Sequence, residues 1–325
     1  MSASTGRLPV RSLGRSSVVL AVLAVQFVAF ALAYSLGRPT LYAGFVVLSA
    51  AALGVASRRG TFGVAMATLG SVLLVALGLP LALFVARQSP SAVADRALDP
   101  DVHRVLDLGV YAPLLAAVAS LLFGVPLAYH LSKGFAGQPL IESLVDLPLV
   151  VPHSVAGLII LFGFGKNGAF PGVPVLGTLE GMVLALAFVS APFAVNAARE
   201  AFESVDDRME YAARVHGASP WQTFRRVTGP LAARGIITGG VLAWARAVSE
   251  FGAVAVVAYS VQFFYPPAGQ QVVAQHAPVF VYNTYLTGGL EQSGAVAALL
   301  LGVSAGIFLL VRWLTTDTTT RQGVA

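Results

Sequence analysis

Arg246 and Glu250 are the two residues whose types and spacing most clearly permit chemistry. They lie four residues apart in an apolar stretch at 236–258, so a helix places both side chains on one face. Arg246 is about ten residues, or roughly 15 Å, into that stretch. A charge at the centre of a bilayer costs about 2.5–3.5 kcal/mol on insertion scales, and pairing relieves part of that cost. We therefore expect the pair to face a bundle interior or a water-filled path.

Two interpretations of this pair remain open. Arg246 either lines a route along which it weakly attracts a tetrahedral oxyanion, or it forms a structural ion pair with Glu250. In the second case the pair fixes the helix or a contact between subunits. The spacing of the two residues is compatible with both.

A proline-rich stretch offers a second candidate for the path. Pro148, Pro152 and Gly157 predict either a simple kink or a broken helix beside a substrate route. His153 is either a hydrogen-bonded packing residue or, with Pro152 and Ser154, part of a translocation path or gate.

The elements that must position these residues are membrane helices. Of the 325 residues, 57% are hydrophobic and 11% are charged, and soluble domains carry about twice that charged fraction. Lipid offers no partner to a bare backbone amide, so each apolar stretch of roughly 17–25 residues is expected to be helical. The predicted spans lie near 17–36, 40–56, 62–86, 105–132, 141–164, 179–198, 236–258 and 291–314. The fold class is therefore an all-α, multi-pass cell-membrane protein, a polytopic bundle of about eight transmembrane helices.

The basic residues predict the orientation of the bundle. With a cytoplasmic N-terminus, the inside segments hold 14 of the 20 Lys and Arg residues, the outside segments hold 5, and the last is Arg246. Both termini are then cytoplasmic, and the net charge of +5 reflects membrane orientation rather than nucleic-acid binding. An alternative is a cleaved signal peptide within residues 1–33, although its apolar run is longer than such peptides usually have.

The sequence predicts neither a catalytic nor a metal site. It contains no cysteine, which excludes disulfides, thiolate metal sites and cysteine nucleophiles. It also lacks the HExxH and Walker patterns.

A charged segment at 199–235 interrupts the apolar pattern between the sixth and seventh predicted spans. Apolar residues in its first half recur at helical spacing, and Gly217 is a suitable helix stop. These apolar residues are Ala201, Val205, Met209, Ala212 and Val215. We expect a helix that ends near Gly217.

A second, short helix is expected directly after this stop. Ser219 can cap its N-terminus, Pro220 suits its first position, and Pro230 is expected to end it. Trp221 and Phe224 then lie along one side. A short amphipathic helix with exposed aromatic side chains suits docking in a groove of another protein.

The segment resembles the EAA loop of binding-protein-dependent ABC importers. That pattern runs E-A-A, three residues, Gly, nine residues, an aliphatic residue, two residues, Pro, and the spacing fits at every position. The residues at these positions are Tyr211, Ala212, Ala213, Gly217, Val227 and Pro230. Two residues depart from the pattern: Tyr211 replaces the usual Glu, with Glu210 one step earlier, and Gly229 stands where Leu is common. An ordinary amphipathic loop is the alternative.

The resemblance implies that this loop forms a coupling helix inserted into a cleft of a separate ATPase subunit. The residues that would carry ATPase coupling are Tyr211, Ala212, Ala213, Gly217, Ala218, Ser219, Pro220, Trp221, Phe224 and Pro230. It further implies a homodimer of this chain, an ABC ATPase dimer that binds ATP and Mg, and an extracytoplasmic substrate-binding protein. The chain itself would hold no cofactor, catalyse no bond change, and contact the lipid bilayer rather than nucleic acid.

The same resemblance implies a domain organisation built on a six-helix type I importer core. Residues 1–60 are an N-terminal cytoplasmic segment and an added transmembrane hairpin, and 61–104 are the first core helix and an external loop. Residues 105–314 form the importer domain, and 315–325 form a cytoplasmic tail.

Three further stretches resemble the molybdate/tungstate permeases. They are Gly124–Tyr129, Leu147–Gly157 and Trp244–Ala253, and the last contains the Arg-x-x-x-Glu-Phe-Gly-Ala run. Sulfate permeases have close relatives of that run, so a permease for sulfate or another solute is the alternative. A secondary transporter is a further alternative, but it would need ion-coupling acids or internal repeats, and Glu250 is the one acid deep in a predicted span.

Overall fold

The computed structural model describes residues 24–56 and 60–320 and divides the chain into two compact units. The first unit is Met1–Arg87 and the second is Gln88–Ala325. The boundary between the units, after Arg87, lies inside the predicted segment 61–104. The first predicted core helix, at 62–86, therefore belongs to the N-terminal unit. Each unit is described separately.

The N-terminal unit is a set of apolar helices. A helical stretch at Ala24–Ser35 precedes α2 (Thr40–Ala56) and α3 (Gly60–Ala86), and α2 packs against α3. The Tyr34 hydroxyl donates to the carbonyl of Ala86 at 3.4 Å. The predicted span at 17–36 is described only from residue 24, and the cytoplasmic segment before it lies outside the described residues.

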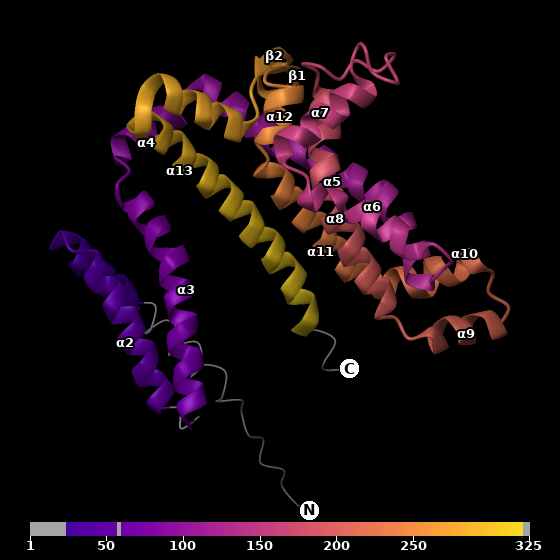
Figure 1. Cartoon of the computed structure of the whole chain (residues 1–325), viewed down its shortest axis with the longest axis horizontal. Coiled ribbons are helices and arrows are strands. Elements are labelled where there is room, and N and C mark those ends of the chain that lie inside the picture. Colours follow the sequence, from indigo (N-terminus) through magenta and orange to yellow (C-terminus); the bar gives the residue numbers. More distant parts are fainter. Residues whose placement is uncertain (1–23, 57–59, 321–325) are drawn as a thin grey trace, which may run out of the picture. The chain divides into compact units, whose positions relative to one another are not determined.

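Three long helices form the centre of the second unit, where α5 (Pro100–Lys133), α8 (Leu179–Glu203) and α11 (Gly229–Val248) lie side by side (Figure 1). Asp99 caps α5 by accepting from the N–H of Asp101, and Thr178 caps α8 by accepting from that of Gly181. The contacts use small, fully buried residues, which let helix backbones approach closely where lipid removes the hydrophobic drive for association. Examples are Ala112, Ala116, Ala185, Ala243 and Ala247.

Two of the predicted spans are broken. The stretch 141–164 forms α6 (Gln138–Val150) and α7 (His153–Phe164), which are bent by 119° relative to each other. The stretch 236–258 forms the end of α11 and a separate α12 (Gly252–Val257). The prediction of one continuous helix over 236–258 is therefore wrong, and Arg246 lies in the last turn of α11 rather than mid-helix.

The segments at the two ends of the core are also ordered. A short helix α4 (Pro90–Ala97) precedes α5, and an antiparallel hairpin of β1 (Val261–Tyr265) and β2 (Gln270–Ala274), joined by η2 (Pro266–Ala268), follows α12. The last helix, α13 (Ala277–Thr320), changes direction at Gly289, where the backbone is not helical. The residues between the predicted spans 236–258 and 291–314 thus contain a hairpin and the first turns of α13.

Most of the charged segment 199–235 folds as α9 (Asp207–Val215), α10 (Pro220–Thr223) and the π-helical turn η1 (Phe224–Thr228). The η1 turn continues into α11. These elements lie at the opposite end of the unit from the β-hairpin (Figure 1). The expected helix through 201–215 is interrupted, because α8 ends at Glu203 and Asp206 caps a new helix.

Among the described residues, five helices are long and apolar enough to cross a membrane, or six if the bent α6–α7 pair is one span. These six overlap the six spans predicted from 62 onward. The count of eight is not confirmed, because Ala24–Ser35 and Thr40–Ala52 are shorter apolar helices. The cytoplasmic location of both termini stays a prediction.

Candidate functional site

The polar residues of the predicted path meet where the two broken spans come together. Pro152 caps the start of α7, and Gly252 begins α12 beside it. A Cβ on Gly252 would lie 2.9 Å from the Cβ of His153, and one on Gly157 would lie 2.8 Å from the Cβ of Val256. A side chain at either position would clash, so these glycines permit the close packing of α7 and α12.

Arg246, Glu250 and His153 form one hydrogen-bonded cluster at this junction. Glu250 Oε2 accepts from Arg246 Nη2 at 2.8 Å, while its Oε1 accepts from the backbone N–H of Ala253 at 2.9 Å. His153 Nδ1 lies 2.6 Å from Glu250 Oε2 and 2.6 Å from Arg246 Nη2. One ring nitrogen either donates to the carboxylate or accepts from the guanidinium, so the cluster has two alternative hydrogen-bond arrangements.

The cluster opens onto a polar cavity of about 640 Å³. The cavity is lined by His153, Ser154, Arg246, Ser249, Glu250, Phe251 and Gly252. The Glu250 side chain is 1% exposed, Arg246 is 19% exposed and His153 is 46% exposed. With a neutral histidine the formal charges cancel, so the cluster would attract an anion only weakly.

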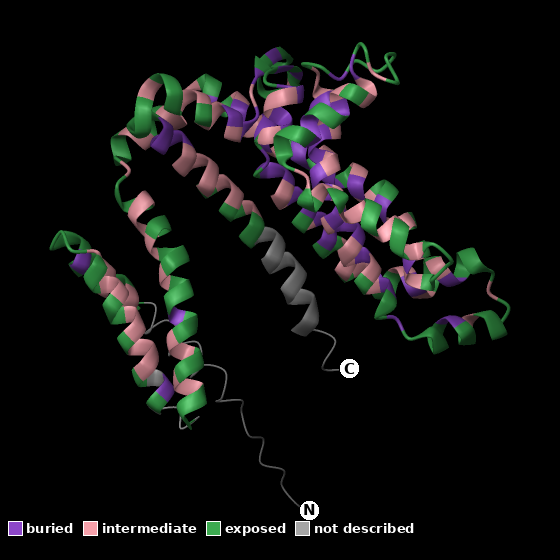
Figure 2. Cartoon of the chain, in the orientation of Figure 1, coloured by how far each residue is buried: buried purple, intermediate pink, exposed green. Residues whose placement is uncertain are grey.

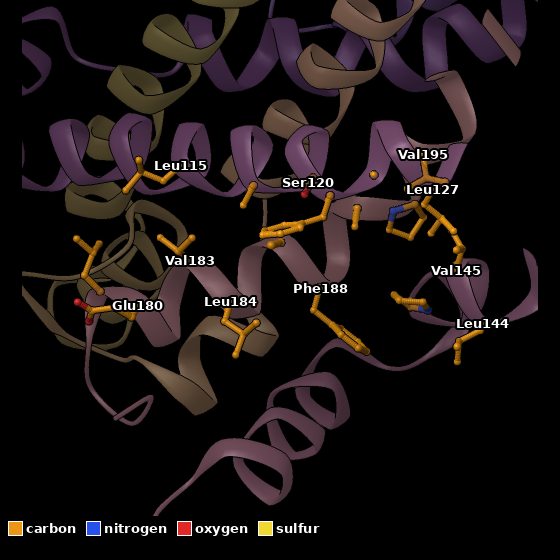
Figure 3. Close-up of a pocket in the computed structure, with 18 residues that line it drawn as sticks. Leu115, Ser120, Leu127, Leu144, Val145, Glu180, Val183, Leu184, Phe188 and Val195 are labelled. Carbon is orange, nitrogen blue, oxygen red and sulfur yellow. The ribbon is translucent and has the colours of Figure 1, made fainter. Parts of the chain in front are cut away.

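A larger cavity of about 910 Å³ lies between α5, α6 and α8 (Figure 3). Its walls are mostly aliphatic and aromatic, with Leu115, Leu184 and Phe188 among them, and Glu180 lies at one end. The hydroxyl of Ser120 in its wall already donates to Ala116. An oxyanion would lose hydration there without gaining hydrogen bonds, so the smaller polar cavity is the better candidate for an anion path.

The predicted coupling segment has the expected local structure around its short helix. Gly217 has a φ of 84°, in the left-handed region that glycine adopts readily. Ser219 and Gln222 form a reciprocal capping box, and Pro220 occupies the first turn of α10. The side chains of Tyr211 and Trp221 are 71% and 65% exposed, and most of α9 and α10 is accessible (Figure 2). Ala212 and Ser219 are exposed, and Ala213 and Ala218 are partly buried.

Phe224 lies against the bundle rather than on the exposed face of the coupling segment. Its ring centroid is 5.1 Å from that of Tyr129 on α5, 6.1 Å from that of Phe202 on α8, and 5.8 Å from that of Trp221. Phe224 therefore joins α10 to two long helices, while Trp221 extends the aromatic stack to the surface.

The expectation that Pro230 ends this short helix is wrong. The helical run continues from Pro220 to Val248, and Pro230 sits at the start of α11. The π-helical turn accommodates it, since the N–H of Gly229 donates to the carbonyl of Phe224 five residues earlier. A Cβ on Gly229 would lie 2.9 Å from that carbonyl oxygen, which explains glycine at a position where the EAA pattern commonly has Leu.

Comparison with known proteins decides the family. Residues 120–316 match the family described as the binding-protein-dependent transport system inner membrane component. The chain belongs to this family. It is a multi-pass membrane protein of the cell membrane, a permease of the ABC transporter type.

Named relatives of this permease transport oxyanions. It is 38% identical over 251 residues to the molybdate/tungstate transport system permease protein WtpB of Pyrococcus abyssi, covering 76% of this chain and 93% of the relative. It is 33% identical over 196 residues to a probable sulfate transport system permease protein, cysT, of Helicosporidium sp. subsp. Simulium jonesii, covering 58% and 73%. A bacterial ABC transporter involved in alginate import shares the fold, with a TM-score of 0.56, 15% identity and coverage of 77% and 93%.

Several polar residues of this permease escaped sequence reasoning because their partners are distant in sequence. Glu210 is buried in the coupling segment, and His276 is fully buried with Nε2 3.3 Å from the carbonyl of Ala247. Asn196 on α8 donates to Asp146 on α6 at 2.7 Å. In the sequence, the one sign of Glu210 was that it directly precedes the position where the EAA pattern usually has Glu.

Proposed function

We propose that this permease is the membrane subunit of an ATP-driven oxyanion importer that moves molybdate or tungstate. A separate ABC ATPase dimer, which holds the ATP and Mg, binds the exposed face of α9 and α10. An extracytoplasmic binding protein delivers the anion, and two copies of this chain form the translocation unit. The chain holds no cofactor of its own.

The observation that carries this proposal is the continuity of the coupling segment with the polar cluster. The helical run from Pro220 to Val248 has 29 residues, or roughly 40 Å of length. It carries the exposed Trp221 at one end and Arg246 in its last turn. A movement imposed on α10 by a partner would therefore reach the cluster through one helix.

The cluster suits the passage of an oxyanion rather than its capture. Arg246 and His153 supply N–H donors at the cavity, but the guanidinium of Arg246 already donates to the carboxylate of Glu250. An oxyanion must compete with that carboxylate, so its residence is short, as a path or gate requires. Ser154 lines the same cavity at the start of α7, and Pro152 is the residue that directly precedes that helix.

Sulfate is the second candidate substrate, because a sulfate permease is among the relatives. Uptake of labelled molybdate, tungstate and sulfate by the reconstituted complex, with and without ATP, separates the candidates. We expect ATP-dependent uptake of molybdate and tungstate in excess of sulfate. A preference for sulfate would support the second candidate, and uptake driven by an ion gradient without ATP would contradict an ATP-driven importer.

A matched pair of variants tests the docking surface. Gly217→Asp places a charge beside α10, while Gly269→Asp makes the same change at a second open left-handed glycine, with a φ of 63°, in the distant β-hairpin. We expect only Gly217→Asp to abolish capture of the ATPase by the purified permease. Equal capture by both variants would contradict docking at α10.

A further inference from the structure

Helix α9 is held to the bundle by a charged side chain rather than by an apolar face. Met209, Tyr211 and Val215 are 51%, 71% and 66% exposed. Glu210 is the buried residue of this helix, and its side chain is 7% exposed. Because α9 buries so little apolar surface, its position depends strongly on what Glu210 contacts.

Glu210 joins three separate elements. Its Oε1 accepts from Lys133 Nζ, the last residue of α5, at 2.8 Å, and from Thr228 Oγ1, the last residue of η1, also at 2.8 Å. Arg214 Nη2 on α9 lies 3.5 Å from its Oε2. The carboxylate thus ties α9 to α5 and to the π-helical turn from which α11 continues.

The charges around Glu210 stabilise its ionised form. Burial opposes ionisation, but hydrogen bonds from Lys133 and Thr228 and the charges of Lys133 and Arg214 outweigh it, so the pKa of Glu210 lies below its usual value. Removing one partner of a buried, hydrogen-bonded charge leaves the other uncompensated. The three elements are therefore expected to stay together while Glu210 and Lys133 are both present.

We propose that Glu210 is a positioning residue that makes α9 move together with α5 and α11, so that a load on the exposed coupling surface reaches the membrane helices. This inference rests on the proposed function, in which an ATPase supplies the load. Tyr211 and Trp221 form the contact surface, and Glu210 fixes that surface to the bundle. Without the carboxylate the ATPase still docks, but α9 shifts without moving its neighbours.

The test compares Glu210→Gln with Asp207→Asn in the complete complex. Asp207 lies on the same helix and 3.6 Å from the same Lys133 Nζ, but its side chain is 93% exposed, so it is a matched control. We expect Glu210→Gln to retain ATPase capture and ATP hydrolysis while the number of anions taken up per ATP falls roughly tenfold, which corresponds to about 1.4 kcal/mol of lost coupling. Asp207→Asn should leave that ratio unchanged, since exposed pairs contribute little.

A double-mutant cycle that combines Glu210→Gln with Lys133→Met, and a hydrogen-exchange measurement on the isolated permease, complete the test. Lys133→Met should lower the uptake per ATP as Glu210→Gln does, and the double variant should add little, because both remove the same contact. In the isolated permease, amide hydrogen exchange in α9 should rise in Glu210→Gln and not in Asp207→Asn.

The outcomes distinguish this inference from the proposed function. Faster exchange in α9 with an unchanged uptake per ATP would overturn the positioning role and leave the importer intact. Unchanged exchange would overturn the attachment itself. Absence of ATP-dependent uptake by the unmodified complex would overturn the proposed function and, with it, the transmitted load.

Discussion

Replacing Arg246 by Met should destabilise the permease more than replacing Glu250 by Gln. The two residues belong to one ion pair, but their surroundings differ. Glu250 is 1% exposed, so its carboxylate depends on Arg246 and its other protein partners rather than on water. Arg246 is 19% exposed and lines the polar cavity, where water can solvate it if Glu250 is neutralised.

The remaining contacts set the size of the difference. Without Arg246, the carboxylate keeps the N–H of Ala253 and the ring of His153, so the loss should lie near the lower end of the range for broken buried pairs, about 3 kcal/mol. Glutamine at 250 can still accept from Ala253, and we expect a loss of about 1 kcal/mol. The double variant Arg246→Met/Glu250→Gln should be more stable than Arg246→Met alone, because it leaves no unpaired buried charge.

Unfolding of the purified permease by SDS in mixed micelles, followed by the fluorescence of its three tryptophans, measures these differences. Trp244, on α11 two residues before Arg246, is a local reporter. Equal losses for the two single variants, or a double variant less stable than Arg246→Met, would refute the assignment of Glu250 as the buried partner.

Three other changes test particular elements. Gly157→Val should cost about 1–3 kcal/mol and separate α7 from α12, because its Cβ would lie 2.8 Å from that of Val256. Unfolding by SDS measures this loss, and an unchanged stability would contradict the close packing. Pro230→Ala should change stability by less than about 0.5 kcal/mol, since Pro230 is exposed in a helix that already continues through it. A larger loss in the same assay would mean that Pro230 shapes the π-helical turn. Because the pKa of Glu210 is lowered, its attachment of α9 is complete above the ordinary glutamate value of 4.5 and is lost as the pH falls through the lowered value. The mobility of a spin label on α9 should therefore be constant from about pH 7 to pH 5 and rise only below pH 4.5, and a rise already near pH 6 would contradict the assignment.

Features set by local chemistry were predictable from the sequence. Ser219 and Pro220 start α10 as expected, because a hydroxyl cap and a first-turn proline act within a few residues. Gly217 ends the preceding turn for the same kind of reason. The six core spans were visible because lipid demands long apolar helices.

Features set by distant contacts were not predictable. The apolar run at 236–258 gives no sign of the break after Val248, which depends on glycine contacts with α7 and on Glu250 accepting from Ala253. Glu210 looked like a misplaced EAA carboxylate, because its partner Lys133 lies 77 residues away. Phe224 was expected on the docking face, but it is partly buried against the aromatic rings of α5 and α8.

Single-cysteine cross-linking measures most directly whether the exposed face of α9 and α10 contacts an ATPase. The chain contains no cysteine, so one introduced at Val215, which is 66% exposed on α9, is a unique reporter, and Phe170, 61% exposed between α7 and α8, gives the control. In membranes that contain the assembled complex, a membrane-permeant thiol-to-amine reagent should join Val215→Cys, and not Phe170→Cys, to the ATPase. Cross-linking from Phe170→Cys, or none from Val215→Cys in a complex that still contains the ATPase, would contradict the account.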